Sequence, residues 1–275
     1  MKVGFWNVQR LGGSSPEEKK SLVANVIDKF FDELDVELMV LCEITSDTVV
    51  NSSSENEHKI EKIVHRPRRT NRRTSSALGY TLITKEGLDA TAWKFEVPSF
   101  TDIFDQPNHR KGGSDYYNKG KRHVLTLSHY EEGWDLYFYH ANAISGGGSK
   151  HAVAWIAEAL RLENSDKAGN VLHPFVLIGD LNCHPTELRL CINELADIVG
   201  KDSDWAKGFQ VVHGSETHTT QPKDGEPALQ KTFDYAVGTK GGGRTIKVKA
   251  IDTRFIGGSA LESHPDHLPI VVTFV

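Results

Sequence analysis

The fold of this chain is decided near its C-terminus, by His264-Pro265-Asp266-His267-Leu268-Pro269 and the apolar run Ile270-Val271-Val272-Thr273-Phe274 that follows it. Proline fixes φ and disfavours helix at its own position and at the residue before it. The first segment therefore predicts a stiff loop, and the second predicts a β-strand. The loop presents an adjacent carboxylate and imidazole, a pair suited to hold a metal-directed oxygen beside a proton acceptor.

Polar residues of the same kinds end or interrupt five other apolar runs. A carboxylate beside a fully apolar strand is costly unless it is paired or bound to a metal. A single case is explained by a turn or a helix cap, but the repetition predicts catalytic groups gathered on loops at a sheet edge. The residues are Asn7, Glu43, His140 with Asn142, Asp180 with Asn182, and Asp234.

Length, cysteine content and charge bound the class of protein. At 275 residues the chain can bury a large core, so we expect one domain over residues 1–275 that needs no disulfide. Its three cysteines lack paired spacing, and we expect Cys42, Cys183 and Cys191 to be buried thiols. The formal charge of −5 means that binding to nucleic acid would need a local basic patch.

No segment predicts a signal peptide or a membrane span. Residues 1–7 contain no apolar core of a signal peptide, and no run approaches about 18 uncharged apolar residues. We therefore expect no stable membrane insertion, and either a cytoplasmic protein or a mature or excised toxin-like domain. The chain is expected to be a monomer or the catalytic domain of a larger protein.

Short β-like runs alternate with a few amphipathic helices, which indicates a two-sheet α/β sandwich. Ser14-Ser15-Pro16-Glu17-Glu18 predicts a helix start with a Ser cap, and apolar residues continue at helical spacing to residue 34. Further helices are expected at 150–162 and 187–198, with a short helical piece around Ile60 and Ile63. Strands are expected at 2–6 ending at Asn7, 38–42 stopping at Glu43, 80–84, 91–97, 122–129, 134–139, 175–178, 232–237 and 270–274. The last two of these strands are expected to follow one another along the chain. Residues 98–120 are expected to form a long loop at the rim of a site.

The order of these motifs resembles the endonuclease/exonuclease/phosphatase superfamily, the fold of deoxyribonuclease I. The resemblance spans Asn7 to His267, and Gly-Asp-x-Asn after a buried strand with a terminal Asp-His-x-Pro is its specific combination. Within the superfamily, His140-Ala141-Asn142-Ala143 followed by Ser145-Gly146-Gly147-Gly148 is most similar to the nuclease subunit of cytolethal distending toxins. The remaining matching motifs are Phe5-Trp6-Asn7-Val8-Gln9, Leu41-Cys42-Glu43-Ile44, Ile178-Gly179-Asp180-Leu181-Asn182 and Thr232-Phe233-Asp234-Tyr235.

The resemblance implies a four-layer sandwich of two mixed β-sheets flanked by helices, and a Mg²⁺-dependent phosphodiesterase that nicks DNA, with Mn²⁺ as an alternative metal. Glu43, with Asn7 and Asp266 nearby, would hold the metal, since Mg²⁺ prefers carboxylate and other oxygen ligands. The catalytic residues would be His140, Asp180, Asn182, Asp234 and His267. Among them, Asp234 would orient His267, Asp180 and Asn182 would orient water and a phosphate oxygen, and His140 would stabilise charge or protonate the leaving group.

Arginine-rich segments are the expected contacts to the substrate. Arg69, Arg72 and Arg73 belong to the run 65–73, which is either a solvated loop or a clamp on the DNA phosphate backbone. Arg122 and Asn142 are further expected substrate contacts. His218-Thr219-Thr220-Gln221 is expected to supply hydroxyl contacts, whereas His184 and His213 are expected to be ordinary surface or core histidines.

Three alternatives stay open at this level. Relatives place a Glu before the strand at Tyr80 to pair with the first catalytic histidine, but Ala77-Leu78-Gly79 contains no acid. Either another carboxylate serves His140 or this histidine is less basic. The same core also suits a phosphatase or phosphodiesterase acting on a phosphoinositide or another lipid or small phosphate ester. A catalytically dead binding module is disfavoured, because every motif position holds a chemically competent residue.

Overall fold

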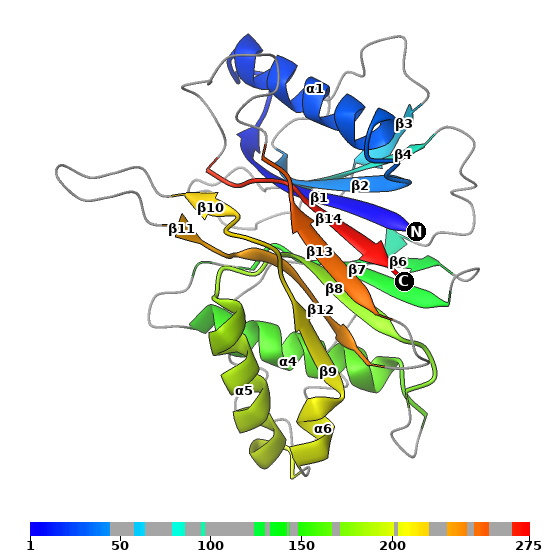
Figure 1. Ribbon diagram of the computed structural model, residues 1–275, viewed down its shortest axis with the longest axis vertical. Helices are drawn as coiled ribbons and strands as arrows, with labels where there is room; N and C mark the ends of the chain where they lie inside the picture. Colours follow the sequence, from blue (N-terminus) through cyan, green and yellow to red (C-terminus); the bar gives the residue numbers. More distant parts are fainter. Residues whose placement is uncertain are drawn as a thin grey trace, which may run out of the picture. The chain divides into compact units, whose positions relative to one another are not determined.

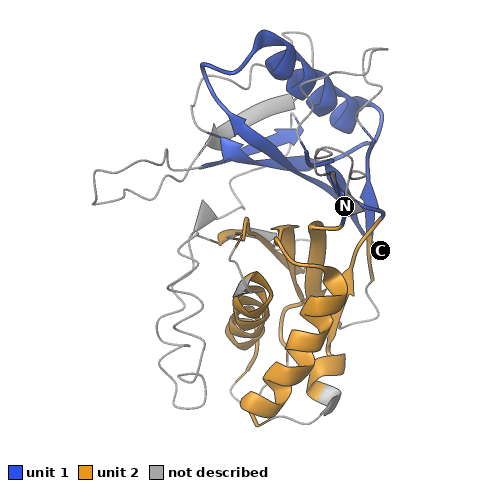
Figure 2. Ribbon diagram, turned by 90° about the vertical axis from the view of Figure 1, so that its left-hand side faces the viewer, with its two compact units in different colours: residues 1–90, 215–231, 248–274 blue, residues 91–214, 232–247, 275 orange. Residues whose placement is uncertain are grey.

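The computed structural model describes residues 1–44, 58–63, 79–85, 95–96, 124–129, 133–141, 143, 148–166, 171–200, 203–219, 230–240, 245–252 and 266–275. The chain divides into two compact units, coloured separately in Figure 2. Unit 1 comprises residues 1–90, 215–231 and 248–274, and unit 2 comprises residues 91–214, 232–247 and 275. No helix in the described ranges combines the length and apolar character needed to cross a membrane.

Unit 1 contains a six-stranded mixed sheet in the order β13-β14-β1-β2-β4-β3, with helix α1 along it (Figure 1). β1 and β2 form its parallel pair, and α1 is the crossover between them. The short antiparallel pair β10 and β11 also belongs to this unit. The elements are β1 (Lys2–Leu11), α1 (Glu17–Asp32), β2 (Leu38–Ile44), β3 (His58–Ile63), β4 (Gly79–Lys85), β10 (His218–Thr219), β11 (Gln230–Lys231), β13 (Ile246–Ala250) and β14 (Ile270–Phe274).

Unit 2 repeats this plan with a six-stranded mixed sheet in the order β5-β6-β7-β8-β12-β9. β7 and β8 form its parallel pair, and α4 is their crossover. The prediction of an α/β fold with two mixed sheets flanked by helices is therefore confirmed. The elements are β5 (Phe95–Glu96), β6 (Leu125–His129), β7 (Trp134–Phe138), α4 (Gly148–Glu163), β8 (Phe175–Asp180), α5 (Pro185–Ile198), α6 (Ser203–Lys207), β9 (Phe209–Val212) and β12 (Asp234–Thr239).

The helices pack on the sheets through the faces that the apolar spacing predicts. Val26, Ile27 and Phe30 of α1 join a buried cluster with the sheet residues Trp6 and Met39. In unit 2, the apolar faces of α4 and α5 form a second cluster with strand residues of that unit's sheet. Burial of each large apolar side chain contributes about 1.5–3 kcal/mol, so these faces stabilise the positions of both helix layers.

Several predicted element boundaries are wrong. β1 continues past Asn7 to Leu11, and β2 continues through Glu43 to Ile44, because bulges keep both strands paired beyond the polar residue. Helix α1 has Pro16 as its N-cap residue without a side-chain cap hydrogen bond, so the predicted Ser cap is absent.

Two other segments also differ from expectation. Residues 58–63 form strand β3 rather than a helical piece, because β4 offers an edge on which they complete an antiparallel ladder. The chain forms an additional strand, β13, between β12 and β14, which were expected to follow one another directly. The alternating burial along β13 is typical of a strand with one solvent-exposed face. The strand predicted at 232–237 is β12, which begins at Asp234 rather than at residue 232 and ends at Thr239.

Candidate active site

Unit 1 brings the predicted metal ligands to one edge of its sheet. β1 and β2 are parallel, so their carboxyl ends, which carry Asn7 and Glu43, lie at the same edge. β14 runs antiparallel to β1, so the residues just before it, Asp266 and His267, also lie there. Asn7 and His267 are buried, with exposed fractions of 2% and 6%.

The backbone is strained at this edge. The register between β1 and β2 shifts after Asn7, and that between β2 and β4 shifts at Glu43. Gln9, Arg10 and Glu43 have positive φ angles of 52°, 60° and 64°. A left-handed residue other than glycine costs on the order of 1–3 kcal/mol, and β-bulges near active sites re-aim side chains. The strain is therefore concentrated where the predicted metal ligands lie.

Gln9 connects three residues of this edge. Its backbone N–H donates to Asn7 Oδ1 (2.9 Å), and its Oε1 accepts from the Asp266 backbone N–H (3.4 Å). Its carbonyl oxygen accepts from Lys19 Nζ (2.6 Å). Burial lowers the pKa of Lys19, while the negative charges of Glu43 and Asp266 oppose this shift.

Lys19 is a member of this edge that the sequence did not predict. It lies in the run Glu17-Glu18-Lys19-Lys20 at the start of α1, which is typical of a solvated helix face. Only the tertiary structure places its ammonium group within electrostatic reach of Glu43 and Asp266.

A second cluster of this unit surrounds Asp266. His267 Nε2 lies 3.7 Å from Asp266 Oδ1, and His218 Nδ1 lies 3.8 Å from Asp266 Oδ2. The two imidazole rings are 4.5 Å apart between centroids, and β10 joins the Asp266 loop by an isolated bridge between His218 and His267. The main chain is held by a hydrogen bond from Trp6 Nε1 to the carbonyl of His267 (2.9 Å). In the described part of the expected 218–221 contact segment, the imidazole of His218 thus lies beside Asp266, one of the predicted ligands.

The residues at this edge fit a hard divalent cation. Asn7, Glu43 and Asp266 offer amide and carboxylate oxygens, which are the donors that Mg²⁺ prefers. Asp266 Oδ1 is buried, and no described residue donates a hydrogen bond to it. Such an atom is stabilised by a cation.

Unit 2 gathers a buried imidazole and two buried carboxylates. β7 and β8 are parallel; His140 follows the carboxyl end of β7 by two residues, and Asp180 is the last residue of β8. His140 Nε2 lies 3.5 Å from Asp180 Oδ2. Asp180 is therefore a carboxylate beside His140 in the described part of the chain, and it is a candidate for the acid that is missing before Tyr80. Asp234 is the Cα partner of Asp180 across the antiparallel ladder, and the two residues are 0% and 1% exposed respectively.

The loop after β8 holds these groups by backbone contacts. Asn182 has a φ of 49°, its N–H donates to Asp180 Oδ1 (3.1 Å), and its Nδ2 donates to the Ala141 carbonyl (2.9 Å). Ala141 in turn donates its N–H to the Asp180 carbonyl (2.8 Å). Asn182 therefore connects the segment after β7 to the segment after β8.

Other predicted residues take structural positions or lie outside the description. His184 is the N-cap of α5, where its Nδ1 accepts from the Thr186 N–H (3.3 Å). His213 is exposed, and the three cysteines are buried free thiols as predicted. Asp234 and His267 belong to different units, and their pairing stays a prediction. The predicted substrate contacts Arg69, Arg72, Arg73, Arg122 and Asn142, together with the rim segment 98–120, lie outside the described residues.

The sequence matches no protein-family model, and it matches no curated protein. Solved structures resemble it along its whole length. CdtB, the biologically active subunit of cytolethal distending toxin, is 17% identical with a TM-score of 0.55, over 99% of this chain and 96% of that chain.

Two further structures share the fold. TDP2 of D. rerio, solved with a single-stranded DNA product, is 12% identical with a TM-score of 0.57, over 100% of this chain and 98% of that chain. An endonuclease/exonuclease/phosphatase family protein from Leptotrichia buccalis is 14% identical with a TM-score of 0.54, over 100% and 99%. The chain therefore has the deoxyribonuclease I-like α/β fold of the endonuclease/exonuclease/phosphatase superfamily.

Proposed function

We propose that this protein is a divalent-metal-dependent phosphodiester hydrolase, and that its substrate is DNA, which it nicks. The observation that carries the proposal is the buried group of His140, Asp180 and Asp234 in unit 2. Two aspartates directly opposite on neighbouring strands repel each other, and burial increases the cost. Buried carboxylates gathered beside a histidine are typical of hydrolytic sites.

In this proposal, Asn7, Glu43 and Asp266 hold Mg²⁺, with Mn²⁺ as a substitute. The bound metal would neutralise negative charge on the phosphate. The strained conformation of Glu43 and the hydrogen bonds of Gln9 support the role of this edge, because Gln9 fixes the Asn7 side-chain oxygen and the main chain of Asp266.

The remaining residues would position water and transfer protons. His267, oriented by Asp234, accepts a proton from the attacking water, while Asp180 and Asn182 orient that water and a phosphate oxygen. His140 stabilises the charge that develops on the phosphate or protonates the leaving oxygen. The Asp180 carboxylate, 3.5 Å from His140 Nε2, would position this imidazole for that role.

DNA as substrate is supported by the neighbours in fold, since one was solved with a single-stranded DNA product and another is a toxin's active subunit. Arg69, Arg72, Arg73, Arg122 and Asn142 would contact the DNA backbone, since Arg presents a bidentate donor to phosphate.

Plasmid nicking tests the proposal. Purified full-length protein with Mg²⁺ should convert supercoiled plasmid to nicked circles, and EDTA should abolish the conversion. His140→Gln and His267→Ala should each abolish nicking, whereas His213→Gln, which changes an exposed histidine outside the proposed site, should retain it. Nicking that persists in EDTA would contradict the metal requirement. Absence of nicking together with phosphate release from phosphoinositides would favour the phosphatase alternative.

A further inference from the structure

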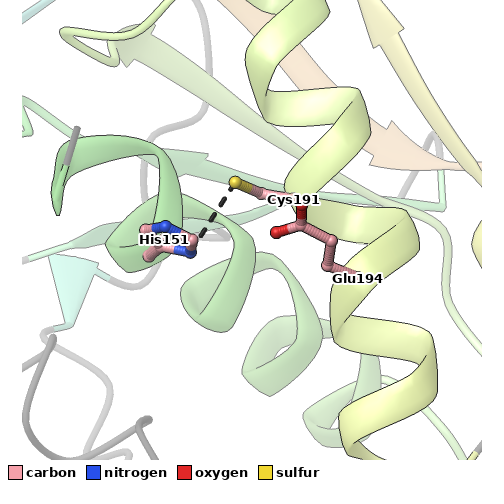
Figure 3. Close-up of side chains that lie close together, drawn as sticks. All are labelled: His151, Cys191 and Glu194. Carbon is pink, nitrogen blue, oxygen red and sulfur yellow. Dashed lines mark hydrogen bonds between the residues drawn. The ribbon is translucent and has the colours of Figure 1, made fainter.

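A second group of metal-binding side chains lies between two helices of unit 2. His151 of α4 and Cys191 and Glu194 of α5 each offer one donor atom, and these three atoms lie within 4.8 Å of one another. Figure 3 shows the three side chains pointing toward one another across the space between the helices. Cys191 and Glu194 are three positions apart, so they project from the same face of α5.

The distance between the sulfur and the nitrogen suits a tetrahedral metal. Cys191 Sγ and His151 Nδ1 are 3.6 Å apart. Zinc–sulfur and zinc–nitrogen bonds of about 2.3 and 2.1 Å at a tetrahedral angle separate the two donors by about 3.6 Å. Without metal, the same distance accommodates a weak hydrogen bond between thiol and imidazole. The two helices therefore hold these donors at the required separation before any ion enters.

The exposure of the three residues allows an ion to enter. Cys191 is 4% exposed, His151 is half-buried and Glu194 is exposed, so the group extends from a buried thiol to the protein surface. The charged neighbours acting on the thiol are Glu187 and Glu194, which are negative, and Lys150, which is positive. The local charge is therefore favourable to a cation.

We propose that His151, Cys191 and Glu194 form a second metal site, which takes a thiophilic divalent ion of the zinc type and cross-links α4 to α5. Sulfur and imidazole donors select such ions over Mg²⁺, in contrast to the all-oxygen donor set of Asn7, Glu43 and Asp266. On binding, a sulfur–metal bond replaces the S–H bond, and the thiol proton passes to solvent. Three protein ligands leave the fourth tetrahedral position to water. The site is independent of the proposed hydrolase function.

Cobalt titration tests this site, because Co²⁺ replaces zinc and its bond to a thiolate produces a near-ultraviolet charge-transfer band. The full chain, stripped of metal, reduced and supplied with excess Mg²⁺, should take up one equivalent of Co²⁺ with this band. The band should be lost in Cys191→Ser, and cobalt affinity should fall at least about tenfold in His151→Gln and in Glu194→Gln. Cys183→Ser is the matched control, since Cys183 is another buried thiol of unit 2, and it should retain the band.

Zinc should also raise the thermal unfolding midpoint of the wild type and of Cys183→Ser more than that of Glu194→Gln. Because Glu194 is exposed, this variant tests the site even if Cys191→Ser folds poorly. A wild-type protein without a cobalt–thiolate band at a large excess of Co²⁺ would overturn the proposal. A band of equal strength in folded Cys191→Ser, or unchanged cobalt affinity in both His151→Gln and Glu194→Gln, would overturn it as well.

Discussion

Gly179, the residue before Asp180 in β8, leaves no room for a side chain. A Cβ atom added at this position would lie 1.8 Å from the Tyr139 carbonyl oxygen and 2.8 Å from the Tyr139 carbonyl carbon. Carbon and oxygen atoms come no closer than about 3.3 Å in weak hydrogen bonds, so Gly179→Ala would force the two backbones apart by about 1.5 Å. The obstructing atoms are backbone, which cannot rotate away as a side chain does.

The substitution should lower both stability and activity. Overpacking a close-packed interior costs about 1–3 kcal/mol where side chains give way, and we expect at least about 3 kcal/mol here. Tyr139 and Gly179 each directly precede a predicted catalytic residue, His140 and Asp180, whose facing atoms are 3.5 Å apart. A displacement of the order of 1 Å in a catalytic site costs about 100-fold in rate, so nicking by the folded fraction should fall by this factor.

Gly4→Ala is the matched control, because Gly4 also lies in a buried strand but its added Cβ would meet side-chain atoms of Phe30 and Met39 at 2.9–3.1 Å. These side chains can adjust, so we expect a loss of about 1–2 kcal/mol. Urea denaturation of both variants and plasmid nicking at equal folded concentration provide the measurements. Equal free energies of unfolding for the two variants, or full activity in Gly179→Ala, would refute the close approach of Gly179 to Tyr139.

Three further results are expected. Glu43→Gly and Glu43→Ala should both lose Mg²⁺-dependent nicking. The glycine variant should be more stable than the alanine variant by about 1 kcal/mol in urea denaturation, because glycine adopts a φ of 64° without strain, and equal urea midpoints would count against this. Replacing Arg69, Arg72 and Arg73 by Ala should reduce the slope of log affinity for DNA against log salt by about three, and an unchanged slope would exclude the arginine clamp. Burial raises the pKa of Cys183 from 9.0 to about 12, so the thiol loses its proton at lower pH in the unfolded state than in the folded state. The free energy of unfolding should therefore decrease above pH 9, by up to about 1.4 kcal/mol per pH unit from this thiol. Cys183→Ser should flatten the decrease between about pH 9 and 10, and a pH profile identical to that of the wild type would contradict the assignment.

Several helices and strands can be predicted from the local pattern of apolar and polar residues. The spacing of apolar residues predicts α1, α4 and α5, because a helix buries one face at a period of 3.6 residues. The apolar runs predict β2, β8 and β14, and the turn around Gly133 predicts the hairpin of β6 and β7, which the ladder between these strands confirms. The same apolar runs predicted His140 just after β7 and Asp180 at the end of β8, whereas β1 and β2 continue past the predicted ends at Asn7 and Glu43.

Other features depend on pairing between distant segments. Residues 58–63 are too short and too polar to indicate their state, and the free edge of β4 makes them a strand. The left-handed conformations of Gln9 and Glu43 arise where β1, β2 and β4 lose register with one another, which no single segment encodes. Lys19 and Gln9 became members of the site only through these contacts.

The sequence by itself thus determined the fold class and the residue types at the strand ends, because burial periodicity and terminal polar residues are local properties of a chain. The tertiary structure alone decided that Asp180 is a carboxylate beside His140 and that His151 meets Cys191, and it placed Asp266 at the predicted sheet edge beside Asn7 and Glu43 through the register of β14 with β1. Each of these pairs is separated by about 40 residues or more along the chain. Their contact results from sheet register and helix packing, which fix distances that spacing along the chain leaves open.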